Sequence, residues 1–220
     1  MYCYPGYNPG MIRHILFDLD NTLYSARNGL EEAVSRRVLE YTISLLKVSA
    51  DEAIRLRSEA LKNYGTTINW LMSEKGFTAF DEYMAYIHPD DEADSLLPDP
   101  ELRCFIENLP CPSSVLTNAP GFHAMRIIKK LELEGVFQRV FDIESNGLKG
   151  KPHPSAYRNV LDTLNLKPEE VLFIDDMPIF VKGFLALGGR GILLDETDIH
   201  KDYSGGRIRE LRELAKFLEP

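Results

Sequence analysis

The chain has 220 residues, of which 44% are hydrophobic and 27% are charged, as in an ordinary globular protein. Its net charge of −9 argues against binding nucleic acid polymers or an anionic membrane, whereas a local cation could still attract a small phosphorylated ligand. The three cysteines show neither C-x-x-C spacing nor a disulfide framework, and no apolar run is long enough to cross a membrane. We therefore expect a cytoplasmic protein.

The chain begins with a segment rich in Tyr, Gly and Pro, residues 1–10, which we expect to be a loosely held leader without signal-peptide features. The apolar run His14–Phe17 predicts a buried strand, and Asp18 and Asp20 follow it directly. Because side chains alternate along a strand, both carboxylates would leave the chain on the same side. Such a pair can bind a cation or share a proton, although a solvated acidic turn is the commoner explanation of this motif alone.

Residues 25–95 predict a helical domain inserted after the first strand, since apolar residues recur there at helical spacing and strand signals are absent. Capping residues and glycines give the helix boundaries. The four predicted helices are bounded by Leu30 and Leu45, by Ser49 and Gly65, by Thr66 or Thr67 and Gly76, and by Phe80 and Ile87.

From Glu101 onward the chain alternates between helix and strand, which predicts a parallel sheet with helices on both faces. The expected strands are Ser114–Thr117, Arg139–Asp142, Val171–Ile174 and Gly191–Leu194. The expected helices are Glu101–Leu109, Gly121–Leu133, Pro154–Leu164, Pro178–Leu187 and Ile208–Leu218. The predicted fold is α/β: a doubly wound parallel-sheet core of residues 11–24 and 96–220, with the helical domain of residues 25–95 inserted.

Further polar residues stand at or near the predicted strand ends: Thr117 and Asn118, Lys151, and Asp175 and Asp176. Each has an ordinary explanation alone, as a helix cap, a solvated turn lysine or an acidic turn. Together with Asp18 and Asp20 they gather four acids, a hydroxyl and a lysine at one edge of one sheet. Oxygen ligands alone suit a hard cation, most often Mg²⁺, while a lysine and a threonine hydroxyl suit phosphate oxygens.

Four motifs carry a family resemblance: F-D-L-D-N-T-L at 17–23, L-T-N at 116–118, K-P at 151–152 and I-D-D at 174–176. In this order and spacing, the chain from Ile12 to about Leu194 resembles the haloacid dehalogenase superfamily of aspartate-nucleophile hydrolases. The resemblance implies a Rossmann-like core, and it implies that the inserted helical domain is a cap that closes over the active site.

The resemblance also implies Mg²⁺-dependent hydrolysis of phosphomonoesters through an aspartyl-phosphate. Asp18 would be the nucleophile, Asp20 the general acid and base, and Thr117 and Lys151 the phosphate-holding groups. The implied metal ligands are Asp18, the backbone carbonyl of Asp20, Asp176 and, through water, Asp175. One departure is Phe180, because members with this acidic pair often have Asn at that position.

A closer resemblance is to the pyrimidine 5′-nucleotidase-like branch. It is carried by D-N-T-L-Y at 20–24, Y-G-T-T at 64–67, I-H at 87–88, L-L-P-D-P-E-L-R at 96–103 and T-N-A-P-G-F-H-A-M-R at 117–126. It implies that nucleoside 5′-monophosphates, pyrimidine ones in preference, are the substrates. The candidate substrate-binding residues are Tyr24, Tyr64, His88 and Asn118.

Several alternatives compete with this prediction. A phospho-receiver domain would have its phosphorylated Asp on a later strand and no helical insertion, and a non-catalytic binding protein would not need every catalytic residue type. A dehalogenase would have no use for the acidic metal set. A sugar-phosphate phosphatase or phosphomutase of the same superfamily stays open. For the phosphatase and the phosphomutase alike, the partner is a small phosphorylated metabolite, and the oligomeric state is left open.

Overall fold

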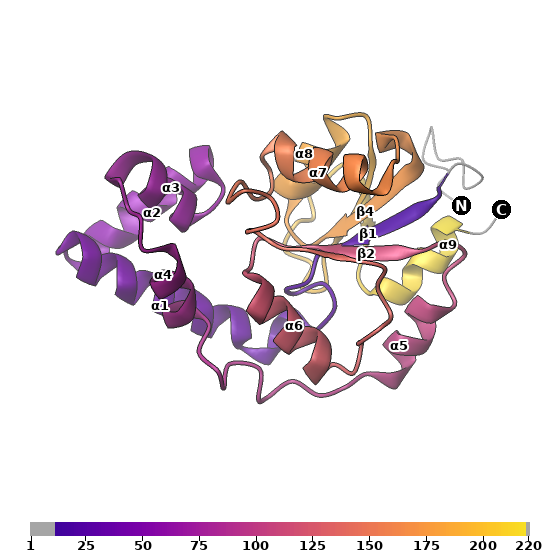
Figure 1. Ribbon diagram of the computed structural model, residues 1–220, viewed down its shortest axis with the longest axis horizontal. Coiled ribbons are helices and arrows are strands. Elements are labelled where there is room, and N and C mark those ends of the chain that lie inside the picture. Colours follow the sequence, from indigo (N-terminus) through magenta and orange to yellow (C-terminus); the bar gives the residue numbers. More distant parts are fainter. Residues whose placement is uncertain (1–11, 219–220) are drawn as a thin grey trace. The chain divides into compact units, whose positions relative to one another are not determined.

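The structure is a computed structural model that describes residues 12–218, and it divides the chain into two units (Figure 1). One unit combines the chain up to Arg27 with the chain from Leu96 onward, and the other is the continuous segment Asn28–Ser95. The predicted leader, residues 1–10, lies outside the described residues. Within those residues, none of the helices is both long and apolar enough to span a membrane.

The first unit is built on a parallel sheet with the strand order β3-β2-β1-β4-β5-β6. Its strands are β1 (His14–Phe17), β2 (Ser113–Leu116), β3 (Val140–Phe141), β4 (Val171–Asp175), β5 (Arg190–Leu194) and β6 (Gly206–Ile208). Phe17 of β1 is in register with Val115 of β2 and with Ile174 of β4, so these three strands end at the same level. The strand order reverses between β1 and β4, which is where open α/β sheets bind ligands.

Helices cover both faces of this sheet (Figure 1). On one face lie α5 (Pro100–Glu107), α6 (Gly121–Lys130) and α9 (Ala215–Leu218), and on the other lie α7 (Pro154–Leu164) and α8 (Pro178–Leu185). The buried cluster between the strands and α7 and α8 consists of Leu16, Leu116, Phe141, Tyr157, Val160, Leu161, Val171, Phe173 and Phe184. Burying a large apolar side chain contributes roughly 1.5–3 kcal/mol, so this cluster fixes the strand ends firmly. The predicted doubly wound α/β fold is confirmed.

The C-terminal region differs from the prediction, because the expected helix Ile208–Leu218 is wrong at its start. Ile208 ends strand β6, and helical structure begins only at Leu211, as a 3₁₀ turn that leads into α9. Arg207 of β6 donates from one nitrogen to Asp195 (2.8 Å) and Asp198 (3.0 Å). A strand of three residues anchored by ion pairs carries too little apolar alternation to be predicted.

The second unit contains α1 (Leu30–Leu46), α2 (Ala50–Tyr64), α3 (Thr67–Lys75) and α4 (Phe80–Ile87). Ser49 Oγ accepts the backbone N–H of Glu52 (3.3 Å), and Thr66 Oγ1 accepts that of Asn69 (3.2 Å), so Thr66 rather than Thr67 caps α3. Edge-to-face ring contacts join the aromatic side chains of this unit: Tyr41, Phe77, Tyr83 and Tyr86. The helical unit therefore has a packed core of its own.

His14 makes the stability of the sheet depend on pH. Its imidazole is buried in β1, with Nε2 3.0 Å from Ser114 Oγ, and burial lowers the pKa of His14 to about 4 from its ordinary 6.5. Between these two pH values the unfolded chain binds a proton at this residue that the folded chain does not. The stability contributed by the neutral imidazole is thus fully present above pH 6.5 and is lost as the pH falls toward 4.

We therefore expect the melting temperature of the wild type to fall more steeply over this range than that of His14→Gln. The contribution of His14 to the slope of the unfolding free energy against pH is at most about 1.4 kcal/mol per pH unit. Melting curves of both proteins at matched ionic strength measure it, with His153→Gln, an exposed position, as the control. Parallel curves for wild type and His14→Gln would contradict the expectation.

Candidate active site

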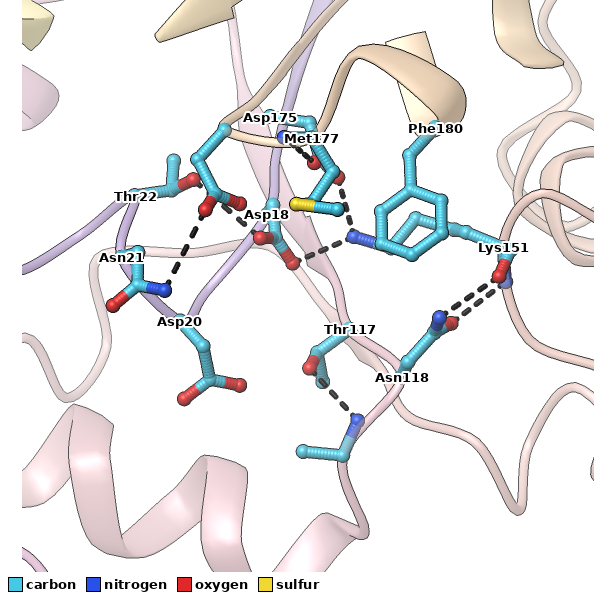
Figure 2. A network of polar contacts seen from close by, with 12 residues as sticks. Asp18, Asp20, Asn21, Thr22, Thr117, Asn118, Lys151, Asp175, Met177 and Phe180 are labelled. Atoms are coloured by element: carbon cyan, nitrogen blue, oxygen red, sulfur yellow. Dashed lines mark hydrogen bonds and ion pairs between the residues drawn. The ribbon is translucent and has the colours of Figure 1, made fainter. Parts of the chain in front are cut away.

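The candidate site lies at the carboxyl ends of β1, β2 and β4 (Figure 2). Asp18 follows β1, and its backbone N–H donates to the carbonyl of Ile174 (2.8 Å), which extends the pairing of β1 with β4 by one residue. This pairing brings the Asp18 side chain level with Asp175, the last residue of β4. Both carboxyl groups are buried. The parallel register alone therefore brings together two acids that are far apart in the sequence.

Lys151 lies between these two acids. Its Nζ donates to Asp18 Oδ1 and to Asp175 Oδ2, both at 2.6 Å, and the residue is only 1% exposed. Burial by itself disfavours the ammonium charge, but Asp175 and Asp18 outweigh it and hold the pKa of Lys151 above its ordinary value. Nζ also lies over the rings of Phe173 and Phe180, 5.4 and 5.1 Å from their centres. Phe180, the departure from the resemblance noted in the sequence, thus offers the lysine an aromatic face.

Asn118 fixes the backbone of Lys151. Its Oδ1 accepts the N–H of Lys151 (2.6 Å), and its Nδ2 donates to the carbonyl of the same residue (2.9 Å), as Figure 2 shows. A Cβ at Gly150 would collide with the Asn118 side chain, so the close approach requires glycine there. Asn118 was predicted to bind substrate. In the structure, both polar atoms of its side-chain amide are hydrogen-bonded to the backbone of Lys151.

Asp18, Asp175 and Asp176 each offer a carboxylate oxygen, and these atoms lie within 4.8 Å of one another. Burial raises the pKa of Asp18 well above its usual range, and Asp175 raises it further, while Lys151 opposes both effects. Burial likewise raises the pKa of Asp175, with Lys151 acting in the other direction. Because Lys151 contacts only two of these three carboxylates, Asp18 and Asp175, a divalent cation would stabilise the ionised forms of the set. A hard cation with oxygen ligands, such as Mg²⁺, fits this donor set.

Two threonine hydroxyls lie at the same edge. Thr22 Oγ1 donates to Asp18 Oδ2 (3.4 Å), which helps to orient the carboxyl group. Thr117 is buried at the end of β2, and its Oγ1 accepts the backbone N–H of Ala119 (3.0 Å). The hydroxyl hydrogen of Thr117 can still be donated to an acceptor such as a phosphate oxygen. Ala119 lies before α6, whose N-cap is Pro120 without a side-chain cap, so Thr117 does not cap this helix. The phosphate-binding role of Thr117 stays a prediction.

Asp20 has two neighbours that the prediction did not assign to it. Tyr24 donates its hydroxyl to Asp20 Oδ1 (2.6 Å), and His123 Nε2 lies 2.8 Å from the same oxygen. Tyr24 was predicted to contact substrate, whereas its hydroxyl contacts the acid. His123 was missed as a site residue, although it falls within the T-N-A-P-G-F-H-A-M-R run. Nothing in that run shows which face of α6 points toward Asp20.

Two predicted substrate residues, Tyr64 and His88, belong to the helical unit. Tyr64 donates its hydroxyl to Glu74 Oε1 (2.8 Å), and His88 Nδ1 lies 2.8 Å from Glu92 Oε2. Each has a carboxylate partner within that unit, and the role of each in substrate binding stays a prediction.

Comparison with protein families identifies the chain as a hydrolase. The family model of the haloacid dehalogenase-like hydrolases matches residues 12–188, and the chain therefore belongs to this family. The family-level prediction from the four motifs is confirmed.

Among curated proteins, the chain is similar to the glyceraldehyde 3-phosphate phosphatases of Pyrococcus furiosus and Methanocaldococcus jannaschii. It is 25% identical to the first over 226 residues, which cover 94% of this chain and 93% of the relative. It is 25% identical to the second over 227 residues, which cover 95% and 99%. The crystal structure of a HAD phosphatase from Thermococcus onnurineus matches the fold with a TM-score of 0.65 at 19% identity, covering 94% of this chain and 98% of that one. These relatives do not support the finer prediction of a pyrimidine 5′-nucleotidase.

Proposed function

We propose that the protein is a Mg²⁺-dependent phosphatase that hydrolyses small phosphorylated metabolites through an aspartyl-phosphate on Asp18. The observation that supports it best is the buried Asp18 carboxyl group, hydrogen-bonded to Lys151 and accompanied by Asp175 and Asp176 at one sheet edge. A buried acid beside a fixed cation suits attack on an anionic phosphate, because the lysine offsets the repulsion between nucleophile and substrate.

In this proposal Asp18 attacks phosphorus, the bond from phosphorus to the leaving oxygen breaks, and the phosphoryl group is transferred to the Asp18 carboxylate. Asp20 gives its proton to the leaving oxygen and then takes one from the water that hydrolyses the aspartyl-phosphate. Lys151 and the Thr117 hydroxyl hold the non-bridging oxygens. Mg²⁺ held by the acidic set, with the backbone carbonyl of Asp20, would neutralise charge between the nucleophile and the phosphate.

The relatives support one substrate class over the other. The two curated relatives described above are named for glyceraldehyde 3-phosphate, which favours a small sugar phosphate over the nucleotide that the closer motif resemblance implied. Nucleoside 5′-monophosphates are the second candidate, supported by the Y-G-T-T and I-H motifs of the helical unit. We take that unit, Asn28–Ser95, to be the substrate-selecting cap. A cytoplasmic location is part of the proposal, since Cys104 and Cys111 are free thiols.

A substrate series tests the function. With Mg²⁺ present, the purified protein should hydrolyse phosphomonoesters, and kcat/KM for glyceraldehyde 3-phosphate should exceed that for uridine 5′-monophosphate by at least about tenfold, or 1.4 kcal/mol. EDTA should remove the activity and excess Mg²⁺ should restore it.

Full activity in chelator would contradict the metal assignment, and failure to hydrolyse any phosphomonoester would contradict the phosphatase assignment. A preference for nucleotides would instead select the second candidate. Tyr64→Ala then tests whether the Tyr64 ring stacks on the base of the nucleotide. Because base stacking is worth about 1–3 kcal/mol, the variant should lose kcat/KM on the nucleotide but not on a small aryl phosphate, which has no base.

A further inference from the structure

Two side chains converge on one oxygen of Asp20. Tyr24, almost fully buried, reaches Oδ1 from the turn that follows β1, and His123, fully buried, reaches it from the first turn of α6. The Asp20 side chain is 24% exposed, so it is the accessible member of this group of three. The two neighbours come from different elements, about a hundred residues apart in the sequence, so the carboxyl group is held by two separate parts of the chain.

We propose that Tyr24 and His123 are positioning residues that hold Asp20 Oδ1 and so direct Oδ2, with its transferable proton, toward the leaving oxygen. The inference rests on the proposed function, in which Asp20 is the general acid and base. A carboxyl oxygen without hydrogen can only accept, so the Tyr24 hydroxyl and His123 Nε2 are both donors here. Oδ1 can accept from both whether the carboxyl group is ionised or carries its proton on Oδ2.

The geometry suits this task. A general acid must bring its proton within about 2.6–3.2 Å of the atom that receives it, and a misplacement of about 1 Å can lower a rate a hundredfold. A single hydrogen bond would leave the Asp20 carboxyl group free to rotate about its side-chain bonds. Two bonds to the same oxygen restrict that rotation and distinguish Oδ1 from Oδ2.

The competing explanation is that Asp20 merely satisfies a buried imidazole and a buried hydroxyl. The two explanations differ in their effect on substrates with different leaving groups. A poor leaving group, such as an alkyl alcohol, needs protonation as it departs, whereas a good one, such as p-nitrophenolate, departs largely without it. A residue that positions the acid affects the first kind of substrate more strongly, and a residue that only stabilises the fold affects both alike.

The test compares hydrolysis of an alkyl phosphate and of p-nitrophenyl phosphate, with Mg²⁺ present, by Tyr24→Phe, His123→Leu and His123→Gln. We expect the first two variants to lose about ten- to a hundredfold in kcat on the alkyl phosphate and clearly less on the aryl phosphate. His123→Gln, which keeps an N–H donor, should recover part of that loss. Tyr86→Phe is the matched control, because its hydroxyl also contacts a carboxylate, Glu40 (3.4 Å), at an exposed site of the helical unit.

Asp20→Asn serves as the reference in the same assay. If Asp20→Asn shows the leaving-group dependence and Tyr24→Phe and His123→Leu do not, the positioning role is wrong and the proposed function stands. If Asp20→Asn affects both substrates equally, the acid role of Asp20 is wrong and the positioning role falls with it. If His123→Leu lowers the melting temperature, the positioning role is judged from Tyr24→Phe alone, because this variant removes one oxygen and leaves the packing in place.

Discussion

Replacing Asp18 with Asn is expected to lower kcat by several orders of magnitude while the protein stays folded. Asn has the shape of Asp but carries no carboxylate, so the acyl-phosphate route is closed. Uncatalysed hydrolysis of phosphate monoesters is so slow that an enzyme must supply on the order of 20 kcal/mol. Because Lys151 keeps its ion pair with Asp175, loss of the Asp18 charge should leave the protein folded.

Steady-state kinetics on an aryl phosphate and thermal melting of Asp18→Asn measure both parts of this expectation. Asp162→Asn, an exposed position on α7, is the matched control and should behave like the wild type. Activity of Asp18→Asn within tenfold of the wild type would refute the nucleophile assignment.

Replacing Lys151 with Met should reduce both stability and activity. Met keeps much of the length of the side chain but leaves the carboxylates of Asp18 and Asp175 without their shared ammonium group. Removing one partner of a buried ion pair typically costs about 3–5 kcal/mol, so the melting temperature measured in chelator should fall markedly. Activity should fall as well, because the group that offsets phosphate charge is gone.

A double variant separates the two effects. Lys151→Met combined with Asp18→Asn removes one of the carboxylates left unpaired, so it should be more stable than Lys151→Met alone and remain inactive. Lys149→Met, an exposed lysine two residues away, controls for the loss of a positive charge in this loop. A melting temperature of Lys151→Met equal to that of the wild type would show that the ion pairs contribute no net stability.

The sheet and the acids at its edge could be predicted from the sequence because both follow from local patterns. Each apolar run is short and ends in polar residues, and parallel strands necessarily bring their carboxyl ends to one edge. The convergence of Asp18 and Asp175 needs only that β1 and β4 are neighbours with the observed register. These features depend on the backbone, whose few regular conformations can be recognised in a sequence.

The contacts of Asn118, Tyr24 and His123 could not be predicted in the same way. Asn118 meets the backbone of Lys151 only because the loop after β3 returns to the end of β2, and a loop path leaves no periodic pattern. His123 depends on the rotation of α6 about its axis. Both Asn118 and Tyr24 are polar residues near a predicted site, which is also the pattern of a substrate ligand.

The helical unit is a continuous segment, Asn28–Ser95, and its aromatic cluster of Tyr41, Phe77, Tyr83 and Tyr86 lies wholly within it. Asp18, Asp20, Lys151 and the acidic pair all belong to the other unit. An insertion that carries its own core can be exchanged as a cassette between related chains without disturbing the strand ends that perform the chemistry. Under the proposed function, in which this unit selects the substrate, such chimeras would let selection, natural or in the laboratory, alter substrate choice while the hydrolytic centre stays constant.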